Sequence, residues 1–233
     1  MGILLPVSDS RAGRASEAGP ARTPPIHTKD KCMAKVLIAF YSRTGVTEVL
    51  AKTIAEGAQA AGAEVRMRRA REVVGREIMQ MAPGWIESAE KMNAEYEAPT
   101  AADAEWADAI ILGTPTRFGL VSSELKAYLD SLGGLWFQGK LVGKVGSTFC
   151  TTSTLHGGNE MTNVGLYIPM MHFGMVLVPP GFADPSVMQG GGSPYGATAV
   201  SGMDGAQPNE LDLAVARYQG RRVVEVADAL RVK

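Results

Sequence analysis

The chain has 233 residues, 45% of them hydrophobic, and its 23 basic and 24 acidic side chains leave a formal net charge of -1. This length and apolar content suffice for one domain with a continuous core. A near-zero net charge creates no field that would attract nucleic acid, and no apolar run approaches the roughly 18 residues of a membrane helix, so we expect neither a nucleic-acid partner nor a membrane span.

Residues 1–32 are rich in Arg, Ala, Pro, Gly and Ser and lack a periodic apolar pattern. Such composition is typical of segments that cannot bury enough apolar surface to fold. We predict a disordered N-terminal tail over 1–32 and one folded domain over 33–233. Met33 stands directly before the first predicted strand, so an alternative is that translation begins there.

Strand patterns and helix patterns alternate from residue 35 onward. The first strand pattern is an unbroken apolar run, typical of a strand buried on both faces, and the first helix pattern repeats every three or four residues. The predicted strands are 35–41, 63–68, 108–113, 145–150 and 174–178. The predicted helices are 46–62, 122–132 with Ser122 or Ser123 as its cap, 159–171 and 209–230.

Two long connections interrupt this alternation. Residues 69–107 show at most one helical stretch, and residues 179–208 are rich in Gly and Pro. Connections of that length usually serve function or subunit contact.

Alternating strands and helices predict an α/β fold with a five-stranded parallel sheet wound on both faces. In such sheets ligands bind beyond the carboxyl ends of the strands. We therefore expect functional residues in the loops that begin at Ser42, Thr114, Thr151 and Pro179.

The first of these loops offers hydroxyls and backbone amides at the start of a helix, which favours a phosphate group. Neither a Walker A sequence nor a Rossmann glycine pattern is present, so a monoester phosphate is the expected ligand. The alternative is that Ser42 and Thr44 merely cap the helix. The loop consists of Ser42, Arg43, Thr44, Gly45, Val46 and Thr47.

The second loop combines a rigid proline with a guanidinium and an aromatic ring, which suits a flat heterocycle. The alternative places Arg117 in solvent and Phe118 in the core. The loop consists of Thr114, Pro115, Thr116, Arg117, Phe118 and Gly119.

The third loop again offers hydroxyls and glycines, namely Thr151, Thr152, Ser153, Thr154 and Gly157. A tyrosine-phosphatase site at Cys150 is excluded, because the required arginine is replaced by His156. We interpret Cys150 as an inert buried strand residue.

Cysteine and histidine usage limits the redox chemistry. Cys32 and Cys150 form no C-x-x-C pair, which favours a reducing cytoplasm over a disulfide framework. His27, His156 and His172 lie far apart in the sequence, without the spacing of a metal site. We expect no protein-held metal and an organic cofactor for any redox chemistry.

The first loop has the [ST]-x-T-G-x-T form of flavodoxins, and the chain from Met33 to about Leu230 resembles the type IV NAD(P)H:quinone oxidoreductases, also called the tryptophan-repressor-binding flavoprotein family. The most specific matches are the runs 113–119, 133–136, 172–175, 194–197 and 216–220. The resemblance implies a flavodoxin-like fold with strand order 2-1-3-4-5. It also implies an FMN cofactor, NADH or NADPH as hydride donor, a quinone substrate and a homotetramer.

The resemblance also assigns roles to residues. It implies that Ser42 to Thr47 hold the FMN phosphate, that the 115–119 loop contacts the isoalloxazine edge, and that 151–157 supply further polar contacts. His172 would reach a flavin across the site, and Trp136 would bound the substrate slot. The alternatives are a structural His172 and a core Trp136.

This sequence departs from the family at two places. Thr44 stands where the family often has an aromatic residue that contacts the nicotinamide. The segment around Leu155 and His156 is one residue longer than usual.

The implied activity is a two-electron quinone reduction by a ping-pong mechanism in one slot, with a cytoplasmic location. Two rival hypotheses are a flavodoxin-type electron carrier, although carriers are usually shorter and more acidic, and a non-catalytic regulatory flavoprotein.

Overall fold

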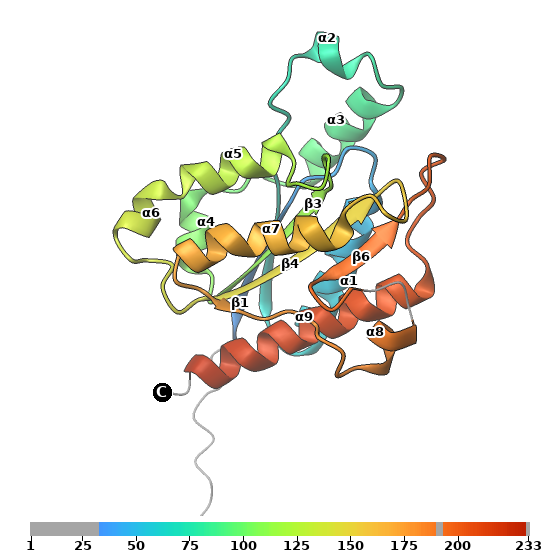
Figure 1. The fold of residues 1–233 in the computed structure, drawn as a ribbon. Coiled ribbons are helices and arrows are strands. Elements are labelled where there is room, and N and C mark those ends of the chain that lie inside the picture. Colours follow the sequence, from blue (N-terminus) through green and yellow to red (C-terminus); the bar gives the residue numbers. More distant parts are fainter. Residues whose placement is uncertain (1–32, 190–192, 232–233) are drawn as a thin grey trace, which may run out of the picture. The chain divides into compact units, whose positions relative to one another are not determined.

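The computed structural model describes residues 33–189 and 193–231, so the tail predicted over 1–32 lies outside the described residues. Six strands in this part of the chain form one parallel sheet of order β2-β1-β3-β4-β5, and β6 pairs with β4 (Figure 1). The predicted strand order is confirmed. The strands are β1 (Lys35–Phe40), β2 (Glu64–Arg69), β3 (Ala109–Pro115), β4 (Val145–Thr152), β5 (Val176–Leu177) and β6 (Ala197–Val200).

Helices cover both faces of the sheet. α1 and α9 pack on one face, and α4, α5 and α7 pack on the other (Figure 1). No helix in the described ranges is both long and apolar enough to cross a membrane. The helices are α1 (Val46–Ala60), α2 (Arg76–Met79), α3 (Trp85–Glu95), α4 (Ala101–Trp106), α5 (Ser123–Ser131), α6 (Gly133–Phe137), α7 (Asn159–His172), α8 (Pro185–Gln189) and α9 (Glu210–Arg231).

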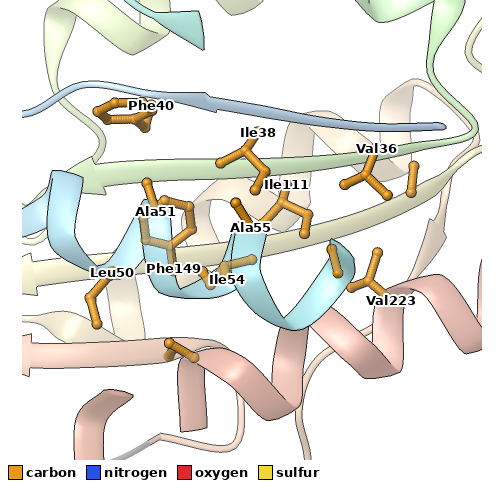
Figure 2. Packing of buried hydrophobic residues seen from close by; sticks show 14 of the residues in the cluster. Val36, Ile38, Phe40, Leu50, Ala51, Ile54, Ala55, Ile111, Phe149 and Val223 are labelled. Carbon is orange, nitrogen blue, oxygen red and sulfur yellow. The ribbon is translucent and has the colours of Figure 1, made fainter. Parts of the chain in front are cut away.

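Strand β1 explains the unbroken apolar run in the sequence. Val36, Ile38 and Phe40 point to the face covered by α1 and α9, where they meet Ile54 and Val223 (Figure 2). Leu37, Ala39 and Tyr41 belong to the core cluster of the opposite face. Both sides of a central parallel strand are buried, so every position must be apolar.

Helices α1 and α9 approach closely through two glycines. A Cβ atom on Gly57 would lie 2.9 Å from the Cα atom of Arg217, and one on Gly220 would lie 2.9 Å from the backbone nitrogen of Ala58. Carbon atoms in ordinary contact are about 3.5–4.0 Å apart. Only glycine therefore permits this approach of the two helices.

Two connections contain more structure than the sequence predicts. Residues 69–107 hold three helices, α2 to α4, instead of at most one. Residues 179–208 hold α8 and the sixth strand, β6. β5 pairs only with Val145 and Gly146 of β4, and β6 pairs with Phe149 to Thr152 further along the same edge. The fifth sheet position is thus split between two strands.

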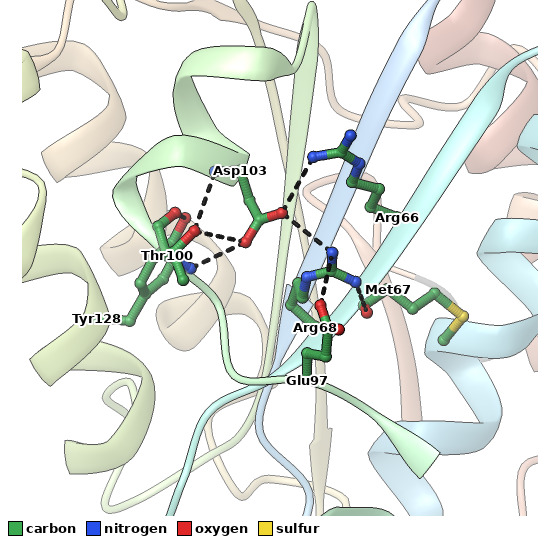
Figure 3. A network of polar contacts seen from close by, with 7 residues as sticks. All are labelled: Arg66, Met67, Arg68, Glu97, Thr100, Asp103 and Tyr128. Carbon is green, nitrogen blue, oxygen red and sulfur yellow. Dashed lines mark hydrogen bonds and ion pairs between the residues drawn. The ribbon is translucent and has the colours of Figure 1, made fainter.

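A polar network fastens α4 to the edge strand β2 (Figure 3). Asp103 accepts hydrogen bonds from the hydroxyl (2.7 Å) and backbone nitrogen (3.1 Å) of Thr100, and its carboxylate forms ion pairs with Arg66 (3.4 Å) and Arg68 (3.2 Å). Tyr128 of α5 donates to the carbonyl of Thr100 at 3.3 Å. The network therefore joins β2, α4 and α5.

Candidate functional site

A cleft of about 810 Å³ opens at the carboxyl ends of β1, β3 and β4. Strand order reverses between β1 and β3, which is the place where open α/β sheets bind ligands. The first three of the four loops in which the sequence predicts functional residues contribute to its walls. The lining residues from those loops are Ser42, Arg43, Thr44, Val46, Thr47, Pro115, Thr116, Arg117, Thr151, Thr152 and Ser153.

The first loop presents the start of α1 to this cleft. Gly45 is the N-cap of α1, and no described side chain caps the helix. Ser42 instead accepts a hydrogen bond from the backbone nitrogen of Gly45 within the loop, at 3.0 Å. The alternative in which Ser42 and Thr44 serve as helix caps is therefore wrong. The first-turn amides and the positive end of the helix dipole remain available to an anion.

Hydrogen bonds between hydroxyls hold the loops at fixed distances. The hydroxyl oxygens of Thr47 and Thr151 lie 2.7 Å apart, which joins the start of α1 to the end of β4. Thr116 donates its backbone nitrogen to the carbonyl of Thr151 at 2.8 Å, and its hydroxyl lies 2.8 Å from that of Thr162. The cleft is thus preorganised before a ligand enters.

The second loop is a tight turn in which Arg117 and Leu120 exchange both backbone hydrogen bonds, at 2.8 and 3.0 Å. Phe118 occupies this turn with a φ of 54° and its side chain is fully exposed. The alternative that places Phe118 in the core is therefore wrong. A bulky residue held at positive φ costs on the order of 1 kcal/mol, and such strain gathers at functional sites.

Burial and neighbouring charges shift the pKa values of two residues at the cleft. Burial lowers the pKa of Arg117, and the positive charge of Arg43 lowers it further. Burial raises the pKa of Tyr41 to about 12, and the carboxylates of Glu124 and Glu72 act in the same direction. The cleft therefore holds two arginines whose mutual repulsion an anion would relieve.

Two further segments of the cleft wall come from the long connections 69–107 and 179–208. Ser201 to Gly205 follow β6, and Met81 to Pro83 join α2 to α3. Ser201 donates its backbone nitrogen to the carbonyl of Thr152 at 2.8 Å, which continues the pairing of β6 with β4. The sequence predicts functional residues in the connection that begins at Pro179, and Ser201 to Gly205 lie within that connection. Pro179 itself does not line the cleft, because β5 ends beside Gly146, the second residue of β4.

His172 and Trp136 lie together but away from the cleft. The indole nitrogen of Trp136 donates to the backbone carbonyl of His172 at 3.0 Å, and both residues line a second cavity of about 390 Å³. His172 ends α7, whose 14 residues span about 21 Å from the cleft end at Asn159. Trp136 is 51% exposed, so the alternative of a core tryptophan is wrong.

The remaining predicted residues border the cleft without lining it. Gly45 lies in the first loop, Phe118 and Gly119 lie in the second, and Thr154 and Gly157 lie in the third. The hydroxyl of Thr152 donates to the carbonyl of Thr154 at 2.7 Å, which shapes the third loop from within.

Cys150 is fully buried on β4, and its thiol donates to the side-chain oxygen of Asn159 at 3.0 Å. Burial raises the pKa of Cys150 well above its usual value, so the reactive thiolate is disfavoured. This agrees with an inert strand residue. Within 33–189 and 193–231, no group of three or more His, Cys, Asp or Glu side chains is placed to hold a metal ion.

Comparisons with known proteins give a consistent result. A family model described as NADPH-dependent FMN reductase matches residues 35–189. A protein of Methylocella silvestris named NAD(P)H dehydrogenase (quinone) is 48% identical over 204 residues, covering 85% of this chain and 100% of its own. One of Azorhizobium caulinodans with the same name is 45% identical, covering 85% and 99%.

A solved structure gives the corresponding result for the fold. A flavodoxin of Agrobacterium tumefaciens, described as a WrbA-like protein, is similar with a TM-score of 0.58 and 25% identity, and the match covers 83% of this chain and 97% of that one. The flavodoxin-like fold is therefore confirmed.

Proposed function

This chain belongs to the family of NADPH-dependent FMN reductases, and from that premise we propose that it is an FMN-dependent NAD(P)H:quinone oxidoreductase. The observation that carries the proposal is the cleft at the switch point between β1 and β3, where an uncapped helix start and two arginines face the same space. The relatives named NAD(P)H dehydrogenase (quinone) support the choice of substrates.

The residues in the cleft fit FMN. The amides at the start of α1 and the hydroxyls of Ser42, Thr44 and Thr47 would hold its phosphate. Thr116 and Arg117 would contact the edge of its ring system, and the loop from Thr151 would add polar contacts. FMN supplies the hydride chemistry when bound, and the protein orients the reactants.

One flat slot that takes the two substrates in turn leads to ping-pong kinetics. The loops are already joined by hydrogen bonds between Thr47 and Thr151 and between Thr116 and Thr162, so the slot needs little rearrangement to receive either substrate. No described residue of the cleft wall is required as a nucleophile in this scheme.

A homotetramer in which a neighbouring copy completes the slot is part of the same proposal. Within one chain, His172 at the end of α7 and Trp136 of α6 lie too far from the cleft to reach it, so their implied contacts with flavin and substrate require a second copy. A row of exposed apolar side chains along α7, Met161, Val164, Ile168 and Met171, supports burial of this face in an interface.

A cytoplasmic location completes the proposal. It is supported by the cysteine usage of the sequence and by Cys150, which is a free buried thiol in the described part of the chain.

The decisive experiment is anaerobic stopped-flow spectroscopy of the FMN-loaded protein. We expect NADH or NADPH to bleach the flavin rapidly and an added quinone to restore the colour. Steady-state lines of reciprocal rate against reciprocal NADH should be parallel as quinone is varied, whereas intersecting lines would exclude the single slot. Slow or absent bleaching would instead favour an electron carrier or a regulatory protein.

A further inference from the structure

Two arginines of this domain stack on tryptophans, and one of the two stacks lies at the cleft. The guanidinium carbon of Arg43 lies 3.8 Å from the ring centre of Trp85, the first residue of α3. Arg43 lines the cleft beside the start of α1, whereas Trp85 is 4% exposed and outside it. A buried indole face thus supports a side chain of the phosphate loop. The other stack, Arg66 on Trp106 at 3.9 Å, lies between β2 and α4.

Trp85 is itself fixed by hydrogen bonds that lead back to the same loop. Its indole nitrogen donates to the carboxylate of Glu72 at 3.4 Å. Both oxygens of Glu72 accept from Arg69, at 2.5 and 3.2 Å. Arg69 is fully buried and donates to the backbone carbonyl of Ser42 at 2.9 Å. The segment from Arg69 to Trp85 therefore holds two consecutive residues of the loop, the backbone of Ser42 and the side chain of Arg43.

The guanidinium of Arg43 lies near the hydroxyl of Tyr41, where its charge partly offsets the rise in pKa that burial causes, but it has no carboxylate partner in the described part of the chain. Its buried Nε atom has no hydrogen-bond partner among the described residues, and no described carboxylate lies within ion-pair distance of it. Arg117 faces the same cleft and is close enough for the charge of Arg43 to lower its pKa. Among the described residues of the cleft wall, Asp204 on the loop after β6 is the one carboxylate, and it is exposed. A cation held beside a helix start without a carboxylate partner favours an anionic ligand.

We propose that Trp85 is a positioning residue that fixes Arg43 as a permanent cation at the phosphate end of the cleft, so that the site selects FMN over riboflavin. This rests on the proposed function, because the anion is the FMN phosphate. The proposal also assigns the long connection after β2 a function within the same subunit, namely to position a residue of the cleft. The positive charge of Arg43 attracts the phosphate that FMN has and riboflavin lacks. Because stacking already holds the planar guanidinium in place, little conformational entropy is lost when it binds a phosphate oxygen.

The test measures the dissociation constants of FMN and riboflavin by quenching of flavin fluorescence, at fixed ionic strength, with full-length apoprotein. Arg43→Met keeps the apolar stem and removes the charge. We expect it to weaken FMN binding about tenfold or more, because a charge-assisted hydrogen bond is lost, and to leave riboflavin binding unchanged. The dependence of FMN binding on salt should also become shallower in this variant.

The positioning half of the proposal is tested with Trp85→Leu. We expect about a fivefold loss of FMN affinity from the lost stacking, and no further loss when Arg43→Met is already present. Trp106→Leu is the matched control, because it removes the other stack and should leave both flavin affinities unchanged. If Trp85→Leu does not fold, Trp85→Phe keeps a ring face and lacks the bond to Glu72, and its smaller effect should again vanish in the Arg43→Met background.

Three results would overturn the inference. The first is an unchanged ratio of FMN affinity to riboflavin affinity in Arg43→Met. If that ratio is unchanged and only the KM for NADPH rises, Arg43 acts on the nicotinamide substrate and the inference fails. The second is an equal loss for both flavins in the Trp85 variants, as a purely structural role predicts. The third is a Trp85 effect that persists without Arg43. A wild-type protein that binds neither flavin would remove the proposed function itself, and the inference with it.

Discussion

Replacing Gly158 by Ala tests whether the spacing of two cleft loops controls flavin binding. Gly158 is the N-cap of α7 and has a φ of 96°. A Cβ atom there would lie 2.8 Å from the Cα atom of Gly119 in the loop after β3. The substitution therefore combines backbone strain with a steric clash between the second and third loops.

The backbone strain and the steric clash affect different measurable quantities, namely folding stability and FMN affinity. The left-handed conformation costs an alanine about 1–2 kcal/mol of folding free energy. Carbon atoms in contact are about 3.5–4.0 Å apart, so the two loops must separate by roughly 1 Å to admit the new methyl group. Misplacement of about 1 Å at a preorganised site costs up to about a hundredfold in rate, and we expect at least a tenfold loss of FMN affinity.

Gly62→Ala is the matched control. Gly62 follows α1 with a φ of 90°, but a Cβ atom there meets no described atom within 4 Å. Urea unfolding should show a similar strain penalty in both variants, and FMN titration should show a loss only in Gly158→Ala. Equal FMN affinities in the two variants would refute the role assigned to the loop spacing.

Two further predictions concern stability. Gly220→Ala should lower the free energy of unfolding by about 1–3 kcal/mol, because the added methyl group forces α9 away from α1. Gly165→Ala on α7 should raise it by up to about 1 kcal/mol, because its added methyl group meets no described atom within 4 Å. A Gly220→Ala protein that is stabilised in urea titration would contradict this reasoning. Burial alone would raise the pKa of Asp103, but hydrogen bonds from Thr100 and Arg68 outweigh burial and lower it. The stabilisation that Asp103 gives the folded state is therefore fully present above the unfolded pKa of about 3.9 and is lost as pH falls through the folded-state pKa. Asp103→Asn should cost about 3 kcal/mol at pH 7. The urea midpoints of the two proteins should begin to converge near about pH 4 and should meet only below the folded-state pKa of Asp103.

The parts of the site that could be predicted from the sequence are those encoded locally. The first loop follows a strand that is apolar on both faces, so its position beyond that strand and its chemistry are both readable from adjacent residues. The same holds for the loops after β3 and β4. In each case a buried strand ends and hydroxyl side chains begin within a few residues.

The walls contributed by Met81 to Pro83 and Ser201 to Gly205 were not predictable in this way, because they reach the cleft only through tertiary structure. The sequence offers no signal for the strand pairing that positions the second. The predicted fourth and fifth strands, 145–150 and 174–178, have six and five residues, whereas the observed β4 has eight and pairs with β5 at only two of them, so the later part of its edge is left to another strand. The short run of Ala197 to Val200 is the only partner that the described structure provides for that part.

The predicted roles of His172 and Trp136 illustrate a different limit. Each was assigned from resemblance, and neither lies at the cleft of its own chain. A single sequence carries no signal that separates contacts within a subunit from contacts across an interface. Their roles stay predictions that depend on a second copy.

The split edge of the sheet also explains why α9 carries a buried glutamine. Between Gly146 and Phe149, β4 passes from β5 to β6, and backbone groups at this break need other partners. Gln219 is fully buried there: its amide nitrogen donates to the carbonyl of Thr148 at 2.7 Å, and its oxygen accepts from the backbone nitrogen of Ala197 at 2.7 Å. One side chain thus joins β4 to the first residue of β6. β6 leads directly into the loop from Ser201, which forms a wall of the cleft. Helix α9, which does not itself line the cleft, therefore helps to position that wall through Gln219.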